Sequence, residues 1–449
     1  MFSLPVKPLI AFTSLSSKLL NPPKCCKSQP QIERGLSFEV GDTFFRHESS
    51  TGRDLGVLSA AIYKKSHNAL RVLDAMCGCG IRSMRYLVEA DADFVLANDA
   101  NHECGGVISG NLEKADREKK RWVVKHSDAN RVLTECYLER DFFDLIDVDS
   151  FGSESSYLRA AMCAVKLDGL LYVTSTDGYS SGGTGQNMYG SECLCLLVRL
   201  MVNQKVKEKD NVIYSTLAAY GAYVKHMPYS NEIGLRMLIG GAVREASVLG
   251  YQVVPLFSYY SYHGPVFRAM LQIRRGKYPN KRHYSFISYC IQCGNSQAFS
   301  WGELGQMRCS CNNVPGSLIV SGPLWTGPLH SASFLTEMLN LAEQWGWTSN
   351  KTGKHLETLL KLMIDESDPV LPFGYIRLDE ISSRAKVNSP PLDSVLRTLH
   401  KEGYAACRSH IASNAIKTNC PMVDCVRLVK ELQRCPDTGD GKLHHAIEA

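Results

Sequence analysis

The sequence predicts an α/β domain with a mostly parallel sheet, followed by a smaller α+β domain. Short apolar runs alternate with helical patterns between residues 69 and 174, as in a sheet covered by helices on both faces. Two adjacent strand patterns near residues 252–273 then indicate a hairpin. After about residue 278 the pattern changes to paired cysteines and further helices, which indicates a second domain.

Five buried parallel strands are expected in the first domain. They cover residues 69–75, 94–99, 122–126, 145–149 and 170–174, and a helix is expected over Ile81–Ala90. Residues 252–257 and 266–273 are expected to pair around Gly264-Pro265. A hairpin that closes an otherwise parallel sheet distinguishes the class I methyltransferase version of the Rossmann-like fold from a plain dinucleotide-binding fold.

Composition excludes several other classes of protein. The 449 residues suffice for two or three domains. With 44% hydrophobic and 21% charged residues the chain is globular and not disordered. A formal net charge of +5 neither requires nor opposes a nucleic-acid partner. We find no apolar run long enough for a membrane-spanning helix, so no membrane partner is expected.

Residues 1–32 contain no acidic residue, whereas they hold four lysines and many serines. This composition is typical of an organellar transit peptide, and the lack of arginine favours a plastid. The sequence therefore predicts a chloroplast protein, with mitochondrion and nucleus as alternatives. A disordered tail would have a similar composition.

A glycine-rich loop follows the first expected strand, running from Asp74 to Gly80 with glycines at Gly78 and Gly80. Glycines let the backbone approach a ligand, and the helix amino end behind them offers free N–H groups. A dinucleotide site would favour a third glycine where Ser83 stands. The acid before the loop instead favours S-adenosylmethionine, because the carboxylate of that cofactor needs hydrogen-bond donors and its amine needs acceptors. A loop that serves packing alone is the alternative.

Two further acids follow the next two strands. Asp99 closes the second strand, where a carboxylate can accept hydrogen bonds from both ribose hydroxyls. Asp128 precedes Ala129 after the third strand, where it can accept from an adenine amino group. A helix N-cap is the alternative role for Asp128.

The fourth strand ends in Asp147-Val148-Asp149-Ser150-Phe151, at the edge where an open α/β sheet binds its substrate. An acid, a turn residue and an aromatic ring resemble the reaction loop of amino-group methyltransferases. Asp149 can accept hydrogen bonds from an exocyclic amine and take its proton, and Phe151 can stack on the base. An N-cap acid with a core phenylalanine is the alternative.

One group of cysteines has the spacing of a metal site. Cys290 and Cys293 precede Cys309 and Cys311, and such pairs predict a structural zinc held by two short loops. The single residue between Cys309 and Cys311 is irregular, so a strained or lost site is the alternative.

The last part of the chain predicts a winged-helix-like order. Helical stretches cover about 333–366, and Leu378–Val387 and Pro391–Glu402 are expected as helices before a strand that begins near Gly403. Arg408, His410 and Lys417 lie on the expected wing and are candidate RNA contacts.

Over residues 36–430 the chain resembles the tRNA guanine-26 N2-dimethyltransferase family, as an organellar, plant-like member. The matching segments are Gly52–Leu55, Arg71–Ala75, Gly80–Arg82, Asn98-Asp99, Asp147–Gly152, Thr174–Asp177, Pro228–Arg236, Gly322–His330, Arg408–His410 and Ala415–Thr418.

The resemblance implies a methyltransferase domain followed by a tRNA-binding domain, with Asp149 as the catalytic acid. It implies S-adenosylmethionine contacts at Arg53, Arg82, Asp99, Asp128 and Ala129. The family has proline after the catalytic aspartate, where this chain has Ser150. It also carries an Asn-Pro segment where Phe45–Glu48 stands here, and a two-residue spacer in both cysteine pairs.

We therefore expect a monomeric enzyme that transfers methyl groups from S-adenosylmethionine to N2 of guanine 26 in tRNA, once or twice. The expected divisions are a leader at 1–32, a methyltransferase domain at 33–277, a tRNA-binding domain with a zinc-ribbon-like element at 278–435, and a tail at 436–449. Two alternatives are an amino-methyltransferase for another RNA base and a tRNA-binding factor with an impaired transfer loop.

Overall fold

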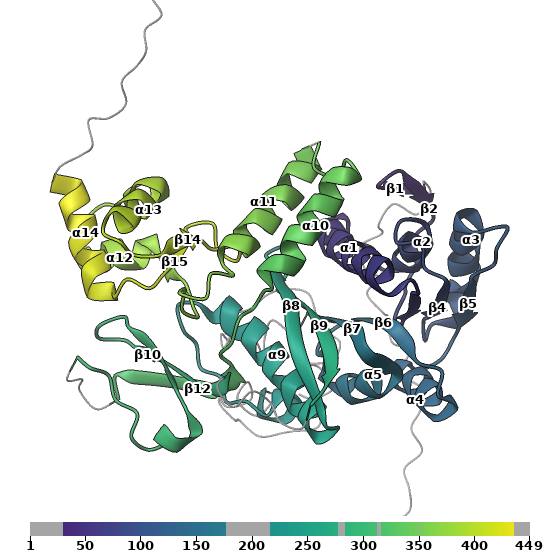
Figure 1. Cartoon of the computed structure of the whole chain (residues 1–449), viewed down its shortest axis with the longest axis horizontal. Coiled ribbons are helices and arrows are strands. Elements are labelled where there is room, and N and C mark those ends of the chain that lie inside the picture. Colours follow the sequence, from purple (N-terminus) through teal and green to yellow (C-terminus); the bar gives the residue numbers. More distant parts are fainter. Residues whose placement is uncertain (1–29, 177–215, 277–282, 312–315, 350, 435–449) are drawn as a thin grey trace, which may run out of the picture.

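A computed structural model describes residues 30–176, 216–276, 283–311, 316–349 and 351–434 (Figure 1). The expected tail at 436–449 and nearly all of the expected leader lie outside these residues. The last leader residues belong to a short hairpin, formed by β1 (Gln31–Glu33) and β2 (Leu36–Phe38). Within the described ranges no helix is both long and apolar enough to cross a bilayer.

A seven-stranded sheet with the order β5-β4-β3-β6-β7-β9-β8 forms the centre of the protein. The first five strands run parallel, and β9 pairs antiparallel with both β7 and β8. This confirms the expected parallel strands and the hairpin. The strands are β3 (Arg71–Asp74), β4 (Phe94–Asn98), β5 (Trp122–Lys125), β6 (Phe143–Asp149), β7 (Val165–Ser175), β8 (Tyr251–Ser261) and β9 (Val266–Arg275).

Helices cover both faces of the sheet, each over its own apolar cluster (Figure 1). One face carries α1 (Ser50–His67), α2 (Ile81–Val88), α3 (Gly105–Ala115), α10 (Ala332–Gln344) and α11 (Lys351–Asp365). The other carries α4 (Ala129–Glu139), α5 (Leu158–Ala164) and α9 (Ser230–Val248). The helix expected over Ile81–Ala90 is confirmed and ends two residues earlier.

Helices α10 and α11 follow residue 278 in the chain, yet they pack with the first domain. Leu335 and Met338 of α10 and Leu360 of α11 belong to the same apolar cluster as Leu55 of α1. Arg34 of the β1–β2 turn lies over the ring of Trp347, which follows α10. The amino-terminal hairpin and this late helical pair therefore stabilise each other across the face of the sheet that carries α1.

Among the described residues after β9, two small antiparallel sheets follow. The first has the order β11-β10-β12, from β10 (Tyr284–Cys290), β11 (Ser296–Phe299) and β12 (Leu318–Trp325). The second has the order β13-β15-β14, from β13 (Ile376–Arg377), β14 (Ala406–Arg408) and β15 (Ala415–Thr418). Helices α12 (Leu378–Ala385), α13 (Leu392–Lys401) and α14 (Met422–Arg434) pack on it. Single 3-10 turns cover His47–Ser49, His102–Cys104, Glu154–Ser156 and Trp301–Glu303.

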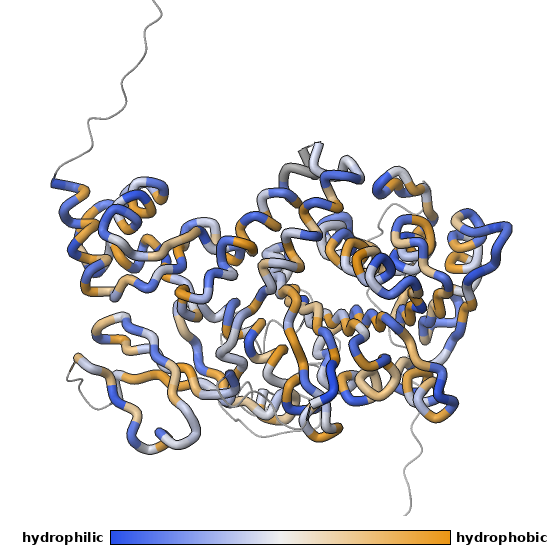
Figure 2. The backbone as a smooth tube through the Cα atoms, in the orientation of Figure 1, coloured by the Kyte–Doolittle hydropathy of each residue, from blue (hydrophilic) through white to orange (hydrophobic). Residues whose placement is uncertain are grey.

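The helix, turn, helix and strand expected between residues 378 and 406 are thus present in that order. The Ser-Pro-Pro turn separates α12 from α13, because proline cannot continue a helix. Hydropathy alternates along α10 to α14 in Figure 2, as expected of helices with one buried face.

Candidate active site

The candidate site lies at the carboxyl ends of β3, β4 and β6. Asp74 ends β3, Asp99 follows β4, and Asp149 ends β6. Because β3 lies between β4 and β6 in a parallel array, these three carboxyl groups share one edge of the sheet. The structure therefore brings together the acids that the sequence placed after successive strands.

The glycine-rich loop is tied to the end of β4. Gly78 and Gly80 adopt φ angles of +56° and +81°, a region that favours glycine. The Gly78 N–H donates to Asp99 Oδ2 at 2.9 Å, and the Asn101 N–H donates to Asp99 Oδ1 at 2.9 Å. Half-buried Asp99 thus orders the loop from the position expected for a ribose-binding carboxylate.

Asp74 and Asp128 both make hydrogen bonds within the protein that stabilise a helix. Asp74 is fully buried and is hydrogen bonded to Ser83 Oγ at 2.7 Å, so it holds α2 against β3. The expectation that its side chain contacts the cofactor does not fit this position, because no atom of Asp74 reaches the surface. Asp128 is exposed and caps α4 by accepting from the Arg131 N–H at 3.2 Å, beside buried Ala129.

A buried guanidinium fixes the end of β6. Arg82 donates to Asp147 Oδ2 at 2.8 Å and to Asp149 Oδ2 at 2.7 Å. Tyr86 Oη also donates to Asp147 Oδ2, at 2.7 Å. Arg82 was expected to contact the cofactor; its nearest partners in the structure are these two carboxylates.

The two carboxylates differ in their tendency to ionise. Burial raises the pKa of Asp147 although Arg82 opposes the rise. Burial would also raise the pKa of Asp149, but attraction to Arg82 and then to Arg268 outweighs it, so that pKa lies below its usual value. The Asp149 side chain is 30% exposed, whereas that of Asp147 is fully buried. Asp149 is therefore the ionised acid that a bound molecule can reach.

Two exposed aromatic rings meet just after β6, where Phe151 follows Asp149 by two residues. Phe151 is 71% exposed and Phe44 is 57% exposed, and the rings meet edge to face with centroids 4.8 Å apart. Phe44 precedes α1 and was not identified from the sequence. The only signal for it was a pair of large apolar residues in an otherwise polar segment. Exposed aromatic rings beside an acceptor form a surface on which a planar base can stack.

Ser150, the residue that replaces proline, is integrated into the loop. It is buried, and its Oγ donates to the Thr174 carbonyl at 2.9 Å. The next turn is held by Thr176, whose Oγ1 accepts from the Gly152 N–H at 2.7 Å and whose N–H donates to the Gly152 carbonyl at 2.9 Å. Serine thus fixes the loop by a hydrogen bond to β7 where proline would restrict φ.

Arg53 also lies in the interior. Its Nε donates to Glu33 Oε1 at 2.8 Å, and its guanidinium lies over the ring of Phe45. Arg53 was expected to contact the cofactor, and in the structure its guanidinium is paired with the amino-terminal hairpin.

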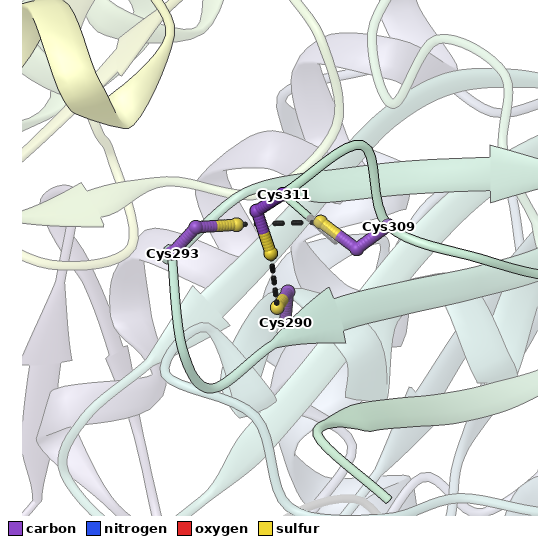
Figure 3. Close-up of side chains that lie close together, drawn as sticks. All are labelled: Cys290, Cys293, Cys309 and Cys311. Atoms are coloured by element: carbon purple, nitrogen blue, oxygen red, sulfur yellow. Dashed lines mark hydrogen bonds between the residues drawn. The ribbon is translucent and has the colours of Figure 1, made fainter. Parts of the chain in front are cut away.

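Four cysteine side chains meet at the end of β10, where Cys290 closes the strand and the other three lie on connecting loops (Figure 3). Cys290 and Cys311 have sulfur atoms 3.7 Å apart, and those of Cys293 and Cys309 are 3.3 Å apart. Tetrahedral zinc with Zn–S bonds of about 2.3 Å requires sulfur separations of roughly 3.8 Å. The four thiols are free cysteines, so the donor set and its spacing fit zinc despite the short Cys309–Cys311 spacer.

The expected RNA contacts at His410 and Lys417 do not fit the structure, because both side chains are buried. Lys417 Nζ lies 2.9 Å from Glu232 Oε2 of α9 and 3.5 Å from Glu366 Oε2. Arg408 remains at the surface, where it pairs with Asp393 at 2.6 Å.

His410, His330 and Glu366 also have the composition of a metal site. However, the Ser258 N–H donates to His330 Nδ1 at 3.3 Å, which leaves the proton of the neutral ring on Nε2, where a metal would bind. Burial lowers the pKa of His330 to about 4, so the ring is neutral near pH 7. With the Lys417 ammonium beside Glu366, this cluster is a buried ion network.

Comparison with known proteins relates the chain to one family over most of its length. The model of the family "N2,N2-dimethylguanosine tRNA methyltransferase" matches residues 29–207 and 210–430. A tRNA (guanine(26)-N(2))-dimethyltransferase of Thermococcus kodakarensis is 30% identical over 405 residues, which cover 87% of this chain and 93% of that protein. The corresponding enzyme of Aeropyrum pernix is 26% identical over 401 residues, 87% of this chain and 90% of that protein.

A solved structure has the same fold. Trm1 from Pyrococcus horikoshii, determined as a complex with S-adenosyl-L-methionine, superimposes with a TM-score of 0.70 at 24% identity. The match covers 89% of this chain and 99% of that one. The likeness confirms the α/β methyltransferase fold with its carboxyl-terminal domain.

The protonation of Asp74 predicts a pH dependence of stability. Burial and the nearby Asp147 raise the pKa of Asp74 to about 8. Between the unfolded value near 3.8 and about 8 the folded protein keeps this proton while the unfolded chain releases it. Stability should therefore fall as pH rises through this window, by at most about 1.4 kcal/mol per pH unit.

Urea unfolding of wild type and Asp74→Asn from pH 5 to pH 8 measures the effect. We expect the variant to lose less stability with rising pH than wild type does. Asp168→Asn, at an exposed site, is the control and should follow wild type. Parallel curves for Asp74→Asn and wild type would contradict the buried proton.

Proposed function

The chain belongs to the N2,N2-dimethylguanosine tRNA methyltransferase family, and we propose that Asp149 is the carboxylate at which it performs the reaction of that family. The reaction is dimethylation of N2 of guanine 26 in tRNA, dependent on S-adenosylmethionine. One observation carries the assignment of Asp149. It is the ionised, partly exposed acid at the end of β6, fixed by Arg82 and followed two residues later by Phe151, whose exposed ring meets that of Phe44.

The chemistry of the target explains this arrangement. An exocyclic base amine is a weak nucleophile, because its lone pair is delocalised into the ring. A carboxylate that accepts an N–H hydrogen bond orients the amine and can take the proton released on transfer. Phe44 and Phe151 then stack on the base and keep its amine at Asp149. Because N2-methylguanine retains one N–H, the same contact serves the second transfer.

S-adenosylmethionine supplies the electrophilic methyl group. Gly78 presents backbone where no side chain intrudes, and Asp99 and Asp128 offer carboxylate oxygens for hydroxyl and amino groups. Ala129 lies beside Asp128 at the start of α4. Arg82 contributes through the position of Asp149.

We assign tRNA binding to the carboxyl-terminal part, whose two helices and adjoining strands have the order of a winged helix. Arg408 supports this assignment because its side chain is exposed on β14. Our assignment of the protein to the chloroplast rests on the acid-free segment 1–32 alone. A binding factor with an impaired loop is less favoured, because Ser150 is hydrogen bonded to β7.

Replacement of Asp149 should slow transfer strongly without unfolding the protein. Asp149→Asn keeps the shape but loses the negative charge, and we expect kcat to fall by roughly 100-fold or more. Incorporation of labelled methyl into tRNA transcripts with guanine or adenine at position 26 measures this. Asp168→Asn should retain full activity. Full activity of Asp149→Asn would refute its role, and failure of wild type on guanine 26 would refute the function.

The aromatic pair should contribute to base binding. Each of Phe44→Ala and Phe151→Ala loses one stacking surface, which is worth roughly 1–3 kcal/mol per base. We therefore expect each variant to lower kcat/KM for tRNA by about 5-fold or more. Phe44→Tyr and Phe151→Tyr should retain most activity. Tyr137→Ala, at an exposed aromatic residue of α4, is the control. Equal activity of the alanine variants and wild type would show that the rings do not hold the base.

We propose that the cysteine cluster binds one structural zinc. Four thiolates leave no open coordination position, so the metal stabilises the small sheet and takes no part in transfer. Purified protein should contain about one zinc per chain by elemental analysis, and Cys290→Ser and Cys309→Ser should lose the metal and melt at lower temperature. Cys163→Ser, on α5, should change neither. The proposal would be contradicted by purified protein that contains no zinc and whose melting temperature does not change when a chelator is added.

A further inference from the structure

Arg268 is a buried cation beside Asp149 that the mechanism above does not use. It lies on β9, paired in register with Thr174 of β7, which is itself paired with Asp149 of β6. The whole residue is 2% exposed, and its Nη2 lies 3.9 Å from Asp149 Oδ1. The residue therefore lies on the strand next but one to that of Asp149, at the same edge of the sheet.

The guanidinium has donors without acceptors. Its Nε and Nη1 are buried, and neither makes a hydrogen bond within the part of the chain that the structure describes. A guanidinium carries five N–H donors, and leaving them unpaired in the interior is costly. The fold also makes room for it: a Cβ at Gly52 of α1 would lie 2.7 Å from Arg268 Nε. Gly52 thus permits an unpaired cation at this position.

Attraction to Asp149 explains the charge of Arg268 but does not satisfy its N–H donors. Arg82 already donates to Asp149 at 2.7 Å, whereas 3.9 Å exceeds hydrogen-bonding distance. The close contact of Asp149 is made through Oδ2, which leaves Oδ1 facing the Arg268 side. An acceptor and a donor therefore lie side by side at the end of the sheet.

The pairing edge of guanine has the complementary order. It presents the N2 amine and N1–H as donors, and then O6 as an acceptor. Resting on the function proposed above, we propose that Arg268 is a specificity residue that donates a hydrogen bond to O6 of the target guanine while Asp149 accepts from N2. Adenine carries an amine in place of O6, so it would place a donor against Arg268. In the major groove of DNA, arginine or lysine donating to guanine O6 and N7 is the commonest specific base contact.

A base analogue in the tRNA tests this contact. 2-Aminopurine keeps the N2 amine and lacks O6. Transcripts that carry guanine or 2-aminopurine at position 26 give a preference, the ratio of their kcat/KM values, for each enzyme variant. Wild type should prefer guanine, and Arg268→Met should lower that preference by about 10-fold or more. 2-Aminopurine also lacks N1–H, but this affects wild type and variant alike, so the change in preference isolates Arg268.

Controls separate this role from others. Arg268→Lys keeps one donor and should give an intermediate preference, and Arg159→Met, an exposed arginine of α5, should match wild type. If a variant is inactive, the preference is measured instead as the ratio of its equilibrium affinities for the guanine and 2-aminopurine transcripts, with S-adenosylhomocysteine bound.

Two results would overturn the proposal. One is an unchanged preference in Arg268→Met, with guanine and 2-aminopurine affected equally, as expected if Arg268 only positions Asp149. The other is a loss of S-adenosylmethionine affinity that accounts for the whole defect, as expected if the cation binds the cofactor carboxylate. In both cases wild type still methylates guanine 26, so the proposed function would stand.

Discussion

The ion pair between Arg82 and the two aspartates at the end of β6 is the interaction on which the site depends. A guanidinium buried in the interior needs carboxylate partners, and removal of one member leaves a buried charge unpaired. Arg82 meets Asp147 and Asp149 at once, so helix α2 and strand β6 cannot move independently. The same contact keeps Asp149 ionised while burial raises the pKa of Asp147. Arg82 thus fixes the position of the reactive acid and is the larger of the two attractions that keep it charged.

A second buried network places the amino-terminal segment over this site. Glu33 accepts from Arg53 of α1 and from Arg85 of α2, and Arg85 also donates to Asp54. These pairs anchor the β1–β2 hairpin, and the chain between it and α1 carries Phe44 to the ring of Phe151. Burial raises the pKa of Glu89, another partner of Arg85, to about 7. Charges far apart in the sequence therefore assemble the aromatic half of the site.

A third network joins the carboxyl-terminal part to the methyltransferase domain. Glu232 of α9 meets Lys417 of β15 and Arg236, and Lys417 also lies near Glu366 at the end of α11. Lysine and histidine on a short β-hairpin are usually exposed, which is why Lys417 and His410 were expected to contact RNA. Their interior position follows from the acids that face them, and those acids lie at least 44 residues away in the chain.

The sequence by itself determined the strands of the sheet and its hairpin, because these depend on local periodicity. It also determined the glycine loop, the acids Asp99 and Asp149 at the ends of their strands, and the grouping of the four cysteines, because these depend on spacing. Only the tertiary structure decided which charges meet. Arg53 and Arg82 were expected at the cofactor and are paired with protein carboxylates. Phe44 had only a weak local signal and Arg268 had none. The reason is physical: the charge state and the exposure of a side chain depend on groups brought together by packing, and a linear pattern records spacing but not neighbours.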